Sequence, residues 1–422
     1  MKLEERIALV REVGEEIVTE QDLKTLFETK KKPVAYDGFE PSGKIHVAQG
    51  LMRSYNVNKM VEAGCEFKML VADWHAWANN KLGGDLEAIQ KCGDYFVEVW
   101  KAAGMNLDHV EFVRVSDYVE DEEYWKKVMQ VARHSTLQRV LRTTQIMGRS
   151  EKDTLQASQI LYPCMQAADI FQLKADICQL GMDQRKVNIL AREIGPKIGF
   201  YSPVAVHHHM LMGLGEPLAA NISKLTLWEE RYVTKTTNGV EYRITLRKND
   251  SITCEPSIDQ YSAITKDTKD WKQLGPFQAR VLEVLGKDLV SMELKENSTT
   301  MDRAISLKMS KSKPDTAIFV TDSMEEVKRK LSKAYCPAKE AKENPVLEYA
   351  KYLVFEGTDS MEIKRPEKFG GNAEFNSYQE LEQAFIEGKV HPMDLKNSVA
   401  EGLNDLLEPV RKHFSKGKAA DL

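Results

Sequence analysis

One segment of the chain places two lysines within four residues, Lys308-Met309-Ser310-Lys311-Ser312. Two ammonium groups in one loop can hold a triphosphate and neutralise the charge that develops as pyrophosphate leaves. A solvated basic loop is the alternative, because lysine runs are common at protein surfaces. The segment therefore suggests phosphate chemistry without establishing it.

A second segment, Glu40 to Gly50, contains His46-Val47-Ala48-Gln49 between an expected strand and an expected helix. An imidazole at the start of a helix can donate a hydrogen bond to a phosphate, and the helix dipole also favours anions there. The small residue Ala48 would let an adenine ring lie flat against the helix. A histidine at such a place serves as often only as a cap or a packed residue.

A third group of polar residues shares one face of an expected helix, because Tyr162, Gln166 and Asp169 are spaced at i, i+4 and i+7. Burying these side chains without partners would be costly. They form either the polar wall of a ligand pocket or a network that ties helices together. In the first case Tyr36, on one expected strand, and Gln184, which follows another, would face them.

The elements that position these residues follow from hydrophobic periodicity. Short apolar strands are expected at 33–38, 67–72, 110–115, 176–180 and 203–206. Helices separate them, and residues 1–32 are expected to form one amphipathic helix. This alternation predicts an α/β fold, a Rossmann-like doubly wound parallel sheet, whose ligands bind where strands end near the switch point. His75 follows such a strand end and fits either a pocket wall or a packed core position.

Changes in this alternation of strands and helices divide the chain into parts. We expect a Rossmann-like catalytic domain at 1–216 with a helical region at about 118–150, an inserted subdomain at 217–306, the lysine loop and a linker at 307–335, and a mostly helical domain at 336–422. Within the insertion, Asn238-Gly239 precedes the alternating run Glu241 to Leu246, which predicts a hairpin. Helical sequence resumes at 278–285, and the role of the insertion stays open.

The composition suits a soluble protein of two or three domains, with 422 residues, 42% hydrophobic and 29% charged. A net charge of −5 argues against a surface covered in nucleic acid but leaves room for a local basic face. The adjacent His207, His208 and His209 cannot comfortably converge on one metal. Because the chain has no apolar run of about 18 residues and no apolar signal core, we expect a cytoplasmic protein with no membrane span.

The order of the first two segments on this fold resembles that of the signature motifs of class I aminoacyl-tRNA synthetases. Lys308 to Ser312 matches the KMSKS motif completely. The other motif departs from the family's His-Ile-Gly-His pattern at Ala48 and, more seriously, at Gln49, which can donate a hydrogen bond but cannot carry a charge. The polar helix resembles the tyrosine pocket of archaeal and eukaryotic tyrosyl-tRNA synthetases, and the resemblance covers about 1–216 and 306–414.

This resemblance implies a tyrosine–tRNA ligase, which activates L-tyrosine with ATP and transfers it to the 3′-terminal ribose of tRNA(Tyr). The catalytic charges and donors would be His46, Gln49, Lys308 and Lys311. Tyrosine would be bound by Tyr36 and Asp169 at its phenol, and by Tyr162, Gln166 and Gln184 at its amino group. ATP, with Mg²⁺ on its phosphates and no permanently bound metal, would contact Gly38, His46, Ala48, Gln49, Asp183, Lys308, Met309, Ser310, Lys311 and Ser312.

Two stretches of the tail, 363–371 and 391–397, resemble the anticodon-binding domain of the same family. The residues alone favour a solvated basic turn and a helix cap at Asp394. By the resemblance Asp394 would read the first anticodon base, Phe369, His391 and Pro392 would stack nearby, and Arg185 and Lys186 would meet the acceptor end. The resemblance also implies a homodimer, with its interface in the helical region near 118–150.

Three other readings remain open. The most distant is another nucleotidyltransferase with a His-x-x-His-like motif, which is opposed by the helical tail that resembles an anticodon reader. A tryptophanyl-tRNA synthetase shares the fold and the motif order, but the larger indole needs no phenol-directed acid, so Tyr36 and Asp169 argue against it. A tRNA-binding relative with a decayed active site is opposed by the complete KMSKS motif and supported only by Gln49.

Overall fold

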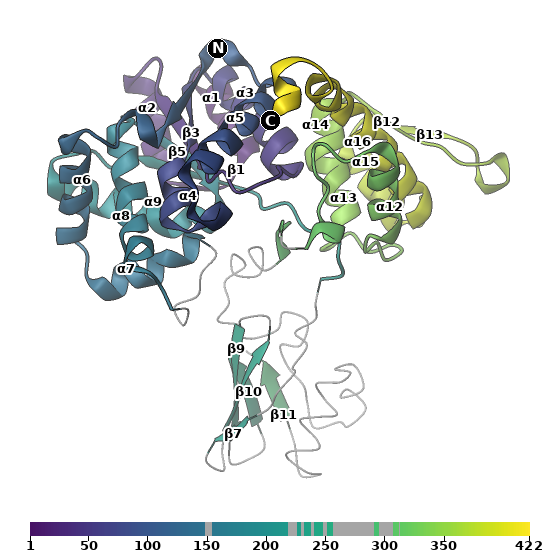
Figure 1. Ribbon diagram of the computed structural model, residues 1–422. Coiled ribbons are helices and arrows are strands. Elements are labelled where there is room, and N and C mark those ends of the chain that lie inside the picture. Colours follow the sequence, from purple (N-terminus) through teal and green to yellow (C-terminus); the bar gives the residue numbers. More distant parts are fainter. Residues whose placement is uncertain are drawn as a thin grey trace. The chain divides into compact units, whose positions relative to one another are not determined.

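The computed structural model describes residues 1–147, 154–217, 307–311 and 313–422, together with five strands between 226 and 294 (Figure 1). The chain forms two compact units. The larger contains Met1–Gly215 and Lys308–Leu422, and the smaller contains Glu216–Leu307.

A six-stranded sheet lies at the centre of the larger unit, with the strand order β1-β6-β5-β2-β3-β4. The strands are β1 (Gly14–Val18), β2 (Val34–Phe39), β3 (Glu66–Val71), β4 (Val110–Arg114), β5 (Ile177–Gly181) and β6 (Val204–His208). Strands β2 to β6 run parallel to one another. The chain builds outward from β2 in one direction and from β5 in the other, so the switch point lies between these two strands. The predicted α/β fold is confirmed.

The N-terminal prediction of one helix over 1–32 was wrong. The chain instead forms α1 (Leu3–Val13), the strand β1 and α2 (Glu20–Thr29). Gly14 allows the chain to pack closely against β6, since a Cβ there would lie 2.8 Å from the Val206 side chain. β1 runs antiparallel to β6, with Ile17 opposite Val206, so the sheet is mixed. Two glutamates, Glu15 and Glu16, lie on this edge strand, where charges discourage pairing with another chain.

Alternate residues of the strands face two different cores. Ala35 and Ile177 belong to one core cluster, while their neighbours Tyr36 and Cys178 belong to the other. This is the period of two expected for strands covered on both faces. Helices α1, α3 (Arg53–Glu62) and α5 (Leu86–Ala102) supply the first core, and α6 (Glu122–Arg133), α8 (Ala157–Gln172) and α9 (Arg185–Ile194) supply the second. Tyr36 therefore faces the α8 side of the sheet.

The C-terminal part of the larger unit is mostly helical, as predicted. Its helices are α12 (Met324–Lys333), α13 (Pro345–Tyr349), α14 (Phe355–Gly357), α15 (Tyr378–Ile386) and α16 (Pro392–Phe414). Figure 1 shows a hairpin of β12 (Met361–Ile363) and β13 (Ala373–Phe375) projecting from these helices. Helix α16 begins at Pro392, so the predicted cap residue Asp394 lies inside its first turn. The cap is instead His391, whose side chain accepts a hydrogen bond from the Met393 amide at 3.2 Å, and Pro392 suits a first helical position.

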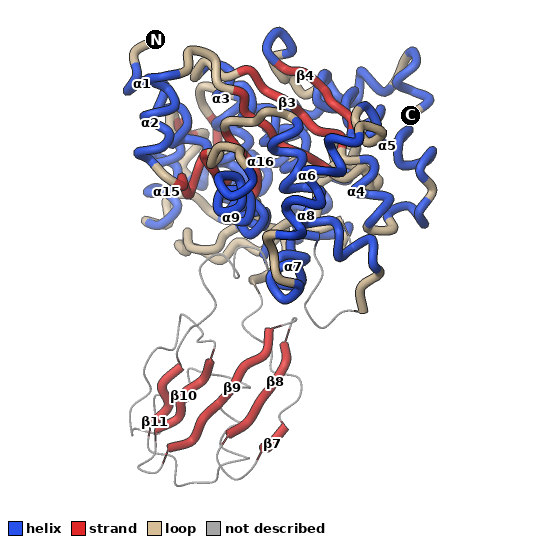
Figure 2. The backbone as a smooth tube through the Cα atoms, turned by 90° about the vertical axis from the view of Figure 1, so that its left-hand side faces the viewer, coloured by secondary structure: helices blue, strands red, loops and turns tan. Residues whose placement is uncertain are grey.

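The smaller unit contains a five-stranded sheet in the order β11-β10-β9-β8-β7 (Figure 2). Its strands are β7 (Thr226–Trp228), β8 (Tyr232–Thr237), β9 (Val240–Arg247), β10 (Ser251–Glu255) and β11 (Ser291–Leu294). β8 and β9 pair antiparallel with Thr237 opposite Val240, which confirms the predicted hairpin strands. The turn residues 238–239 and the helix predicted at 278–285 lie outside the described residues.

Candidate active site

A cavity of about 600 Å³ opens at the carboxyl ends of β2 and β5, where the switch point was expected to place the chemistry. It brings together segments that are far apart in the sequence. The predicted residues that line it are Tyr36, Gly38, His46, Ala48, Gln49, Tyr162, Gln166, Asp169, Asp183, Gln184, Lys308, Met309, Ser310 and Lys311. Ser312 lies outside the described residues.

The α8 wall of this cavity carries the polar stripe predicted from helical spacing. Gln166 donates from its amide nitrogen to Gln184 at 3.1 Å, and Gln184 donates in turn to the Ile146 carbonyl at 3.0 Å. The Gln166 side-chain oxygen is buried and accepts no hydrogen bond within the described residues. A buried acceptor of this kind, next to a cavity, suits a ligand that donates.

Tyr36 contributes a second buried polar group to the same cavity. Its hydroxyl makes no hydrogen bond within the described residues, although the side chain is only 1% exposed. Burial, with the charges of Cys178, Asp169 and Asp37 adding to it, raises the pKa of Tyr36 well above the usual value. The phenol therefore stays protonated and can donate to a ligand.

Asp169 is fully buried on α8 and has two neighbours that can hold its charge. The Tyr118 hydroxyl donates to one carboxylate oxygen at 2.8 Å, and the His75 imidazole lies 3.1 Å from the other. Burial alone would lower the pKa of His75, but the Asp169 carboxylate outweighs it and raises the pKa. His75 also packs edge-on against Tyr162, with ring centroids 4.8 Å apart. His75 thus both lines the cavity and packs in the core. The contact of Tyr118 with Asp169 was indicated by no motif.

His46 lies where the signature segment meets the chain after the lysine loop. The Val47 amide donates to Ile318 at 2.9 Å and the Val320 amide donates to Ile45 at 3.0 Å. Burial, followed by repulsion from Lys311 and Lys308, lowers the pKa of His46 to about 3. The imidazole is therefore neutral at physiological pH, so it can donate a hydrogen bond to a phosphate but adds no positive charge. Gln49 lies one helical turn on, and its side-chain oxygen is buried without a hydrogen-bond partner among the described residues.

The two lysines of the loop reach the cavity from different backbone positions. Lys308 forms an ion pair with Asp183 at 2.7 Å. Lys311 donates to the Ser42 hydroxyl at 3.3 Å and lies over the Phe96 ring at 5.1 Å. These two ammonium groups supply the positive charge that the neutral His46 cannot.

Beneath the cavity lies a buried charge network that sequence reasoning missed. Arg53, only 1% exposed, donates to Asp37 at 2.7 Å and lies 2.9 Å from the His208 ring nitrogen. It also contacts the Gln179 amide oxygen. Burial raises the pKa of Asp37 to about 6, and the charge of Arg53 opposes that rise. Arg53 is the first residue of α3, and no motif indicated its position.

The residues predicted to contact tRNA lie outside the cavity. Arg185 pairs with Glu16 at 2.7 Å and Lys186 contacts Gln145, both in the first turn of α9. His391, Pro392 and Asp394 lie at the start of α16. Phe369 belongs to the short helical turn Glu367–Phe369, and its side chain lies outside the described part of the structure.

The two tail stretches themselves lie side by side. The Arg365 guanidinium donates both to the Gly371 carbonyl at 2.6 Å and to the Lys389 carbonyl. This joins the turn at 365–372 to the residues just before α16.

The three adjacent histidines face different partners. His207 pairs with Glu16 at 2.8 Å, His208 lies beside Arg53, and His209 lies between Glu15 and Glu348. Among the described residues, no group of three or more histidine, cysteine, aspartate or glutamate side chains is arranged to hold a metal ion. In the same part of the chain, no helix combines the length and apolar character needed to cross a bilayer.

Residues 28–217 and 292–408 match the family model of the class I tRNA synthetases for tryptophan and tyrosine. The chain belongs to this family. Cytoplasmic tyrosine–tRNA ligase 1 of Arabidopsis thaliana is 41% identical over 416 residues, which is 98% of this chain and 85% of that protein. The tyrosine–tRNA ligase of Thermococcus kodakarensis is 37% identical over 432 residues, covering 99% of this chain and 96% of that one.

Solved synthetase structures agree with this assignment. The tyrosyl-tRNA synthetase of Pyrococcus horikoshii, complexed with L-tyrosine, aligns with a TM-score of 0.75 and 34% identity over 98% of this chain and 97% of that one. The enzyme of Archaeoglobus fulgidus, also complexed with L-tyrosine, aligns with a TM-score of 0.72 and 33% identity over 98% and 99% of the two chains. The resemblance inferred from the motifs is confirmed.

Proposed function

We propose that the cavity at the switch point carries out both steps of a tyrosine–tRNA ligase reaction. The chain is a class I aminoacyl-tRNA synthetase whose relatives across plants and archaea are tyrosine–tRNA ligases. The observation that carries the assignment of the site is that one cavity contains both a phenol-directed pair, Tyr36 and Asp169, and the two-lysine loop.

The tyrosine subsite follows from the donors and acceptors of the cavity. The protonated Tyr36 hydroxyl can donate to the substrate phenol, which donates in turn to the Asp169 carboxylate. His75 and Tyr118 hold that carboxylate in place. At the amino group of the substrate, the Gln166 side-chain oxygen accepts from the α-ammonium, since it has no hydrogen-bond partner among the described residues. Gln184 and Tyr162 lie beside it.

The first step joins the substrate carboxylate to the α-phosphorus of ATP. One carboxylate oxygen forms the new P–O bond, the bond to the bridging oxygen of the β-phosphate breaks, and pyrophosphate leaves with its electron pair. No protein base is needed because the carboxylate is already ionised. Lys308 and Lys311 neutralise the departing charge, while His46 and Gln49 donate hydrogen bonds to phosphate oxygens. Mg²⁺ enters on the triphosphate as part of the substrate.

The remaining nucleotide contacts come from the same cavity. Gly38 and Ala48 leave room for the nucleotide, and Met309 and Ser310 line the loop beside it. Asp183 accepts from the ribose. Its ion pair with Lys308 has to loosen when ATP binds, because the Lys308 ammonium is needed at the phosphates.

In the second step a hydroxyl of the 3′-terminal ribose of tRNA(Tyr) attacks the adenylate carbonyl and AMP leaves. Arg185 and Lys186, on the first turn of α9, meet the acceptor end. Asp394 reads the first anticodon base, with Phe369, His391 and Pro392 stacking nearby. The helical region near 118–150 forms a homodimer interface, which is supported by the large exposed apolar side chains Met129 and Leu137. The protein acts in the cytoplasm, the compartment named for the Arabidopsis relatives.

Pyrophosphate exchange into ATP, run with each of the twenty amino acids and no tRNA, tests this function. We expect exchange with tyrosine alone. Exchange with tryptophan instead would keep the family and overturn the assignment of Tyr36 and Asp169. Folded protein that exchanges with no amino acid would support the tRNA-binding relative with a decayed site, with Gln49 as the first suspect.

The charge of Lys311 predicts how this exchange depends on pH. Burial, with repulsion from Lys81, lowers the pKa of Lys311 to about 8, although Cys92 and Glu40 oppose the fall. The ammonium is therefore present below pH 8 and lost above it. We expect kcat/KM for ATP, which reports groups of the free enzyme, to fall as the pH rises through about 8. In Lys311→Arg, whose guanidinium stays charged, this falling limb should disappear, whereas a wild-type profile that stays flat to about pH 10 would contradict the prediction.

A further inference from the structure

The segment that follows the lysine loop, residues 317–322, connects the two signature motifs. Its backbone pairs with the residues on both sides of His46, through hydrogen bonds from Val47 to Ile318 and from Val320 to Ile45. The fit leaves no spare room, because a Cβ at Gly50 would lie 2.6 Å from Val320. The position of this segment therefore sets how the lysine loop lies relative to His46 and Gln49.

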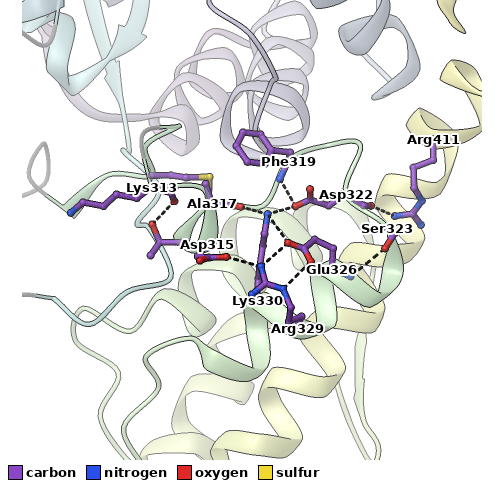
Figure 3. Close-up of polar contacts among 12 residues, drawn as sticks. Lys313, Asp315, Ala317, Phe319, Asp322, Ser323, Glu326, Arg329, Lys330 and Arg411 are labelled. Carbon is purple, nitrogen blue, oxygen red and sulfur yellow. Dashed lines mark hydrogen bonds and ion pairs between the residues drawn. The ribbon is translucent and has the colours of Figure 1, made fainter.

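A buried lysine on the neighbouring helix holds this segment at both ends (Figure 3). Lys330 of α12 is only 4% exposed. Its ammonium donates to the Ala317 carbonyl at 2.8 Å and to the Asp322 carboxylate at 2.7 Å, and it lies over the Phe319 ring at 4.9 Å. The contacts thus span the whole segment that pairs with the signature motif.

Asp322, at the end of the segment, makes two further contacts. Its carboxylate accepts from the Phe319 amide at 2.9 Å, and its carbonyl accepts from Arg411 of α16 at 3.1 Å. Removing an ammonium from water is costly, and the cost is recovered only where good partners meet it. Both hydrogen-bond partners of Lys330 belong to 317–322, and Glu326 of α12 lies farther away, at 3.7 Å. The burial of Lys330 therefore depends mainly on the position of that segment.

We propose that Lys330 is a positioning residue for the ATP half of the active site. It acts through segment 317–322, which holds the downstream end of the lysine loop against the His46 motif, and it touches no substrate. The proposal rests on the proposed function, since it concerns the adenylation step. Misplacing catalytic groups by about 1 Å from a distance can cost about a hundredfold in rate. The expected effect therefore falls on ATP and leaves tyrosine binding unchanged.

Arg329, the next residue on α12, is a matched control. Its guanidinium is 39% exposed and pairs with Glu326 and Asp315, each at 2.7 Å. It makes none of the contacts to 317–322 that Lys330 makes (Figure 3). A variant at Arg329 therefore reports the loss of a cation on α12 whose partners, Glu326 and the 81% exposed Asp315, lie outside 317–322.

The experiment compares Lys330→Met with Arg329→Met in tyrosine-dependent pyrophosphate exchange, at a temperature where both are shown to be folded. For Lys330→Met we expect kcat/KM for ATP to fall about tenfold to a hundredfold, while the Kd for tyrosine, measured by calorimetry without ATP, stays within about twofold. For Arg329→Met both values should stay within about twofold of wild type. Lys330→Arg, which keeps a donor, should recover part of the loss.

A second variant keeps the proposal testable if Lys330→Met does not fold. Asp322→Asn preserves the shape of the side chain and weakens only the ionic contact, so it should lower kcat/KM for ATP about threefold to tenfold with unchanged tyrosine affinity. Normal ATP parameters in folded Lys330→Met, or in Asp322→Asn where the first variant is unfolded, would overturn the proposal. So would an equal loss of tyrosine affinity. Absence of exchange in the wild type would instead reject the proposed function.

Discussion

Replacing Tyr36 with phenylalanine should lower kcat/KM for tyrosine by about a hundredfold and leave kcat/KM for phenylalanine nearly unchanged. The Tyr36 hydroxyl is buried and has no hydrogen-bond partner within the described residues, so its removal deletes only the bond to the substrate phenol. Tyrosyl-tRNA synthetases are the established example of such discrimination, with a preference over phenylalanine of about 10⁵. The variant should reduce that preference to about 10³ in pyrophosphate exchange.

Tyr349→Phe is the control for this measurement. Tyr349 is equally buried, but its hydroxyl donates to the Met212 carbonyl at 3.1 Å and does not line the cavity. Its loss can cost stability, but the preference for tyrosine over phenylalanine should not change. If Tyr36→Phe keeps the wild-type preference within about threefold, then Tyr36 does not read the phenol and the orientation of tyrosine in the cavity has to be reversed.

The second large effect is expected at Lys308. Lys308→Met should lower the rate of adenylate formation by about a hundredfold to a thousandfold, because it removes one of the two cations that meet the developing charge of pyrophosphate. The neutral His46 cannot replace that charge, since the pKa of its imidazole is lowered to about 3. The loss should appear in the rate constant of adenylate formation, measured as pyrophosphate release in a single turnover. Tyrosine affinity should change little.

Lys313→Met serves as the control, because Lys313 is an exposed cation just beyond the loop and does not line the cavity. We expect its adenylation rate to stay within about twofold of wild type. Adenylate formation by Lys308→Met at the wild-type rate would show that Lys308 does not neutralise the charge of the departing pyrophosphate. The same assay on Gln49→His would then show whether the departure from the family motif limits the chemistry.

Much of this site could be predicted from local sequence patterns. The polar stripe of Tyr162, Gln166 and Asp169 follows from the period of the helix, and the ends of β2 and β5 follow from the alternation of strands and helices. These features depend on neighbours within a few residues, so the chain specifies them without its tertiary contacts. The motif order then sufficed to indicate the family, because the lysine loop has a defined place relative to the His46 segment.

The positions of the charged groups, and which of them stay ionised, depend on contacts that form only in the folded chain. The spacing of Ile7, Val10, Val13 and Ile17 reads as one helix, yet Ile17 belongs to a strand because β6 offers it an edge to pair with. Arg53 and Lys330 are residue types that sequence reasoning places in solvent, yet both are buried against partners on other elements, and the Tyr118 hydroxyl likewise meets Asp169 of α8. Burying a charged or hydroxylated side chain depends on partners that only the folded chain brings within hydrogen-bond distance. For that reason the sequence by itself determined the family and the walls of the cavity, whereas the neutral His46, the Lys308–Asp183 ion pair and the anchoring of segment 317–322 depend on the fold.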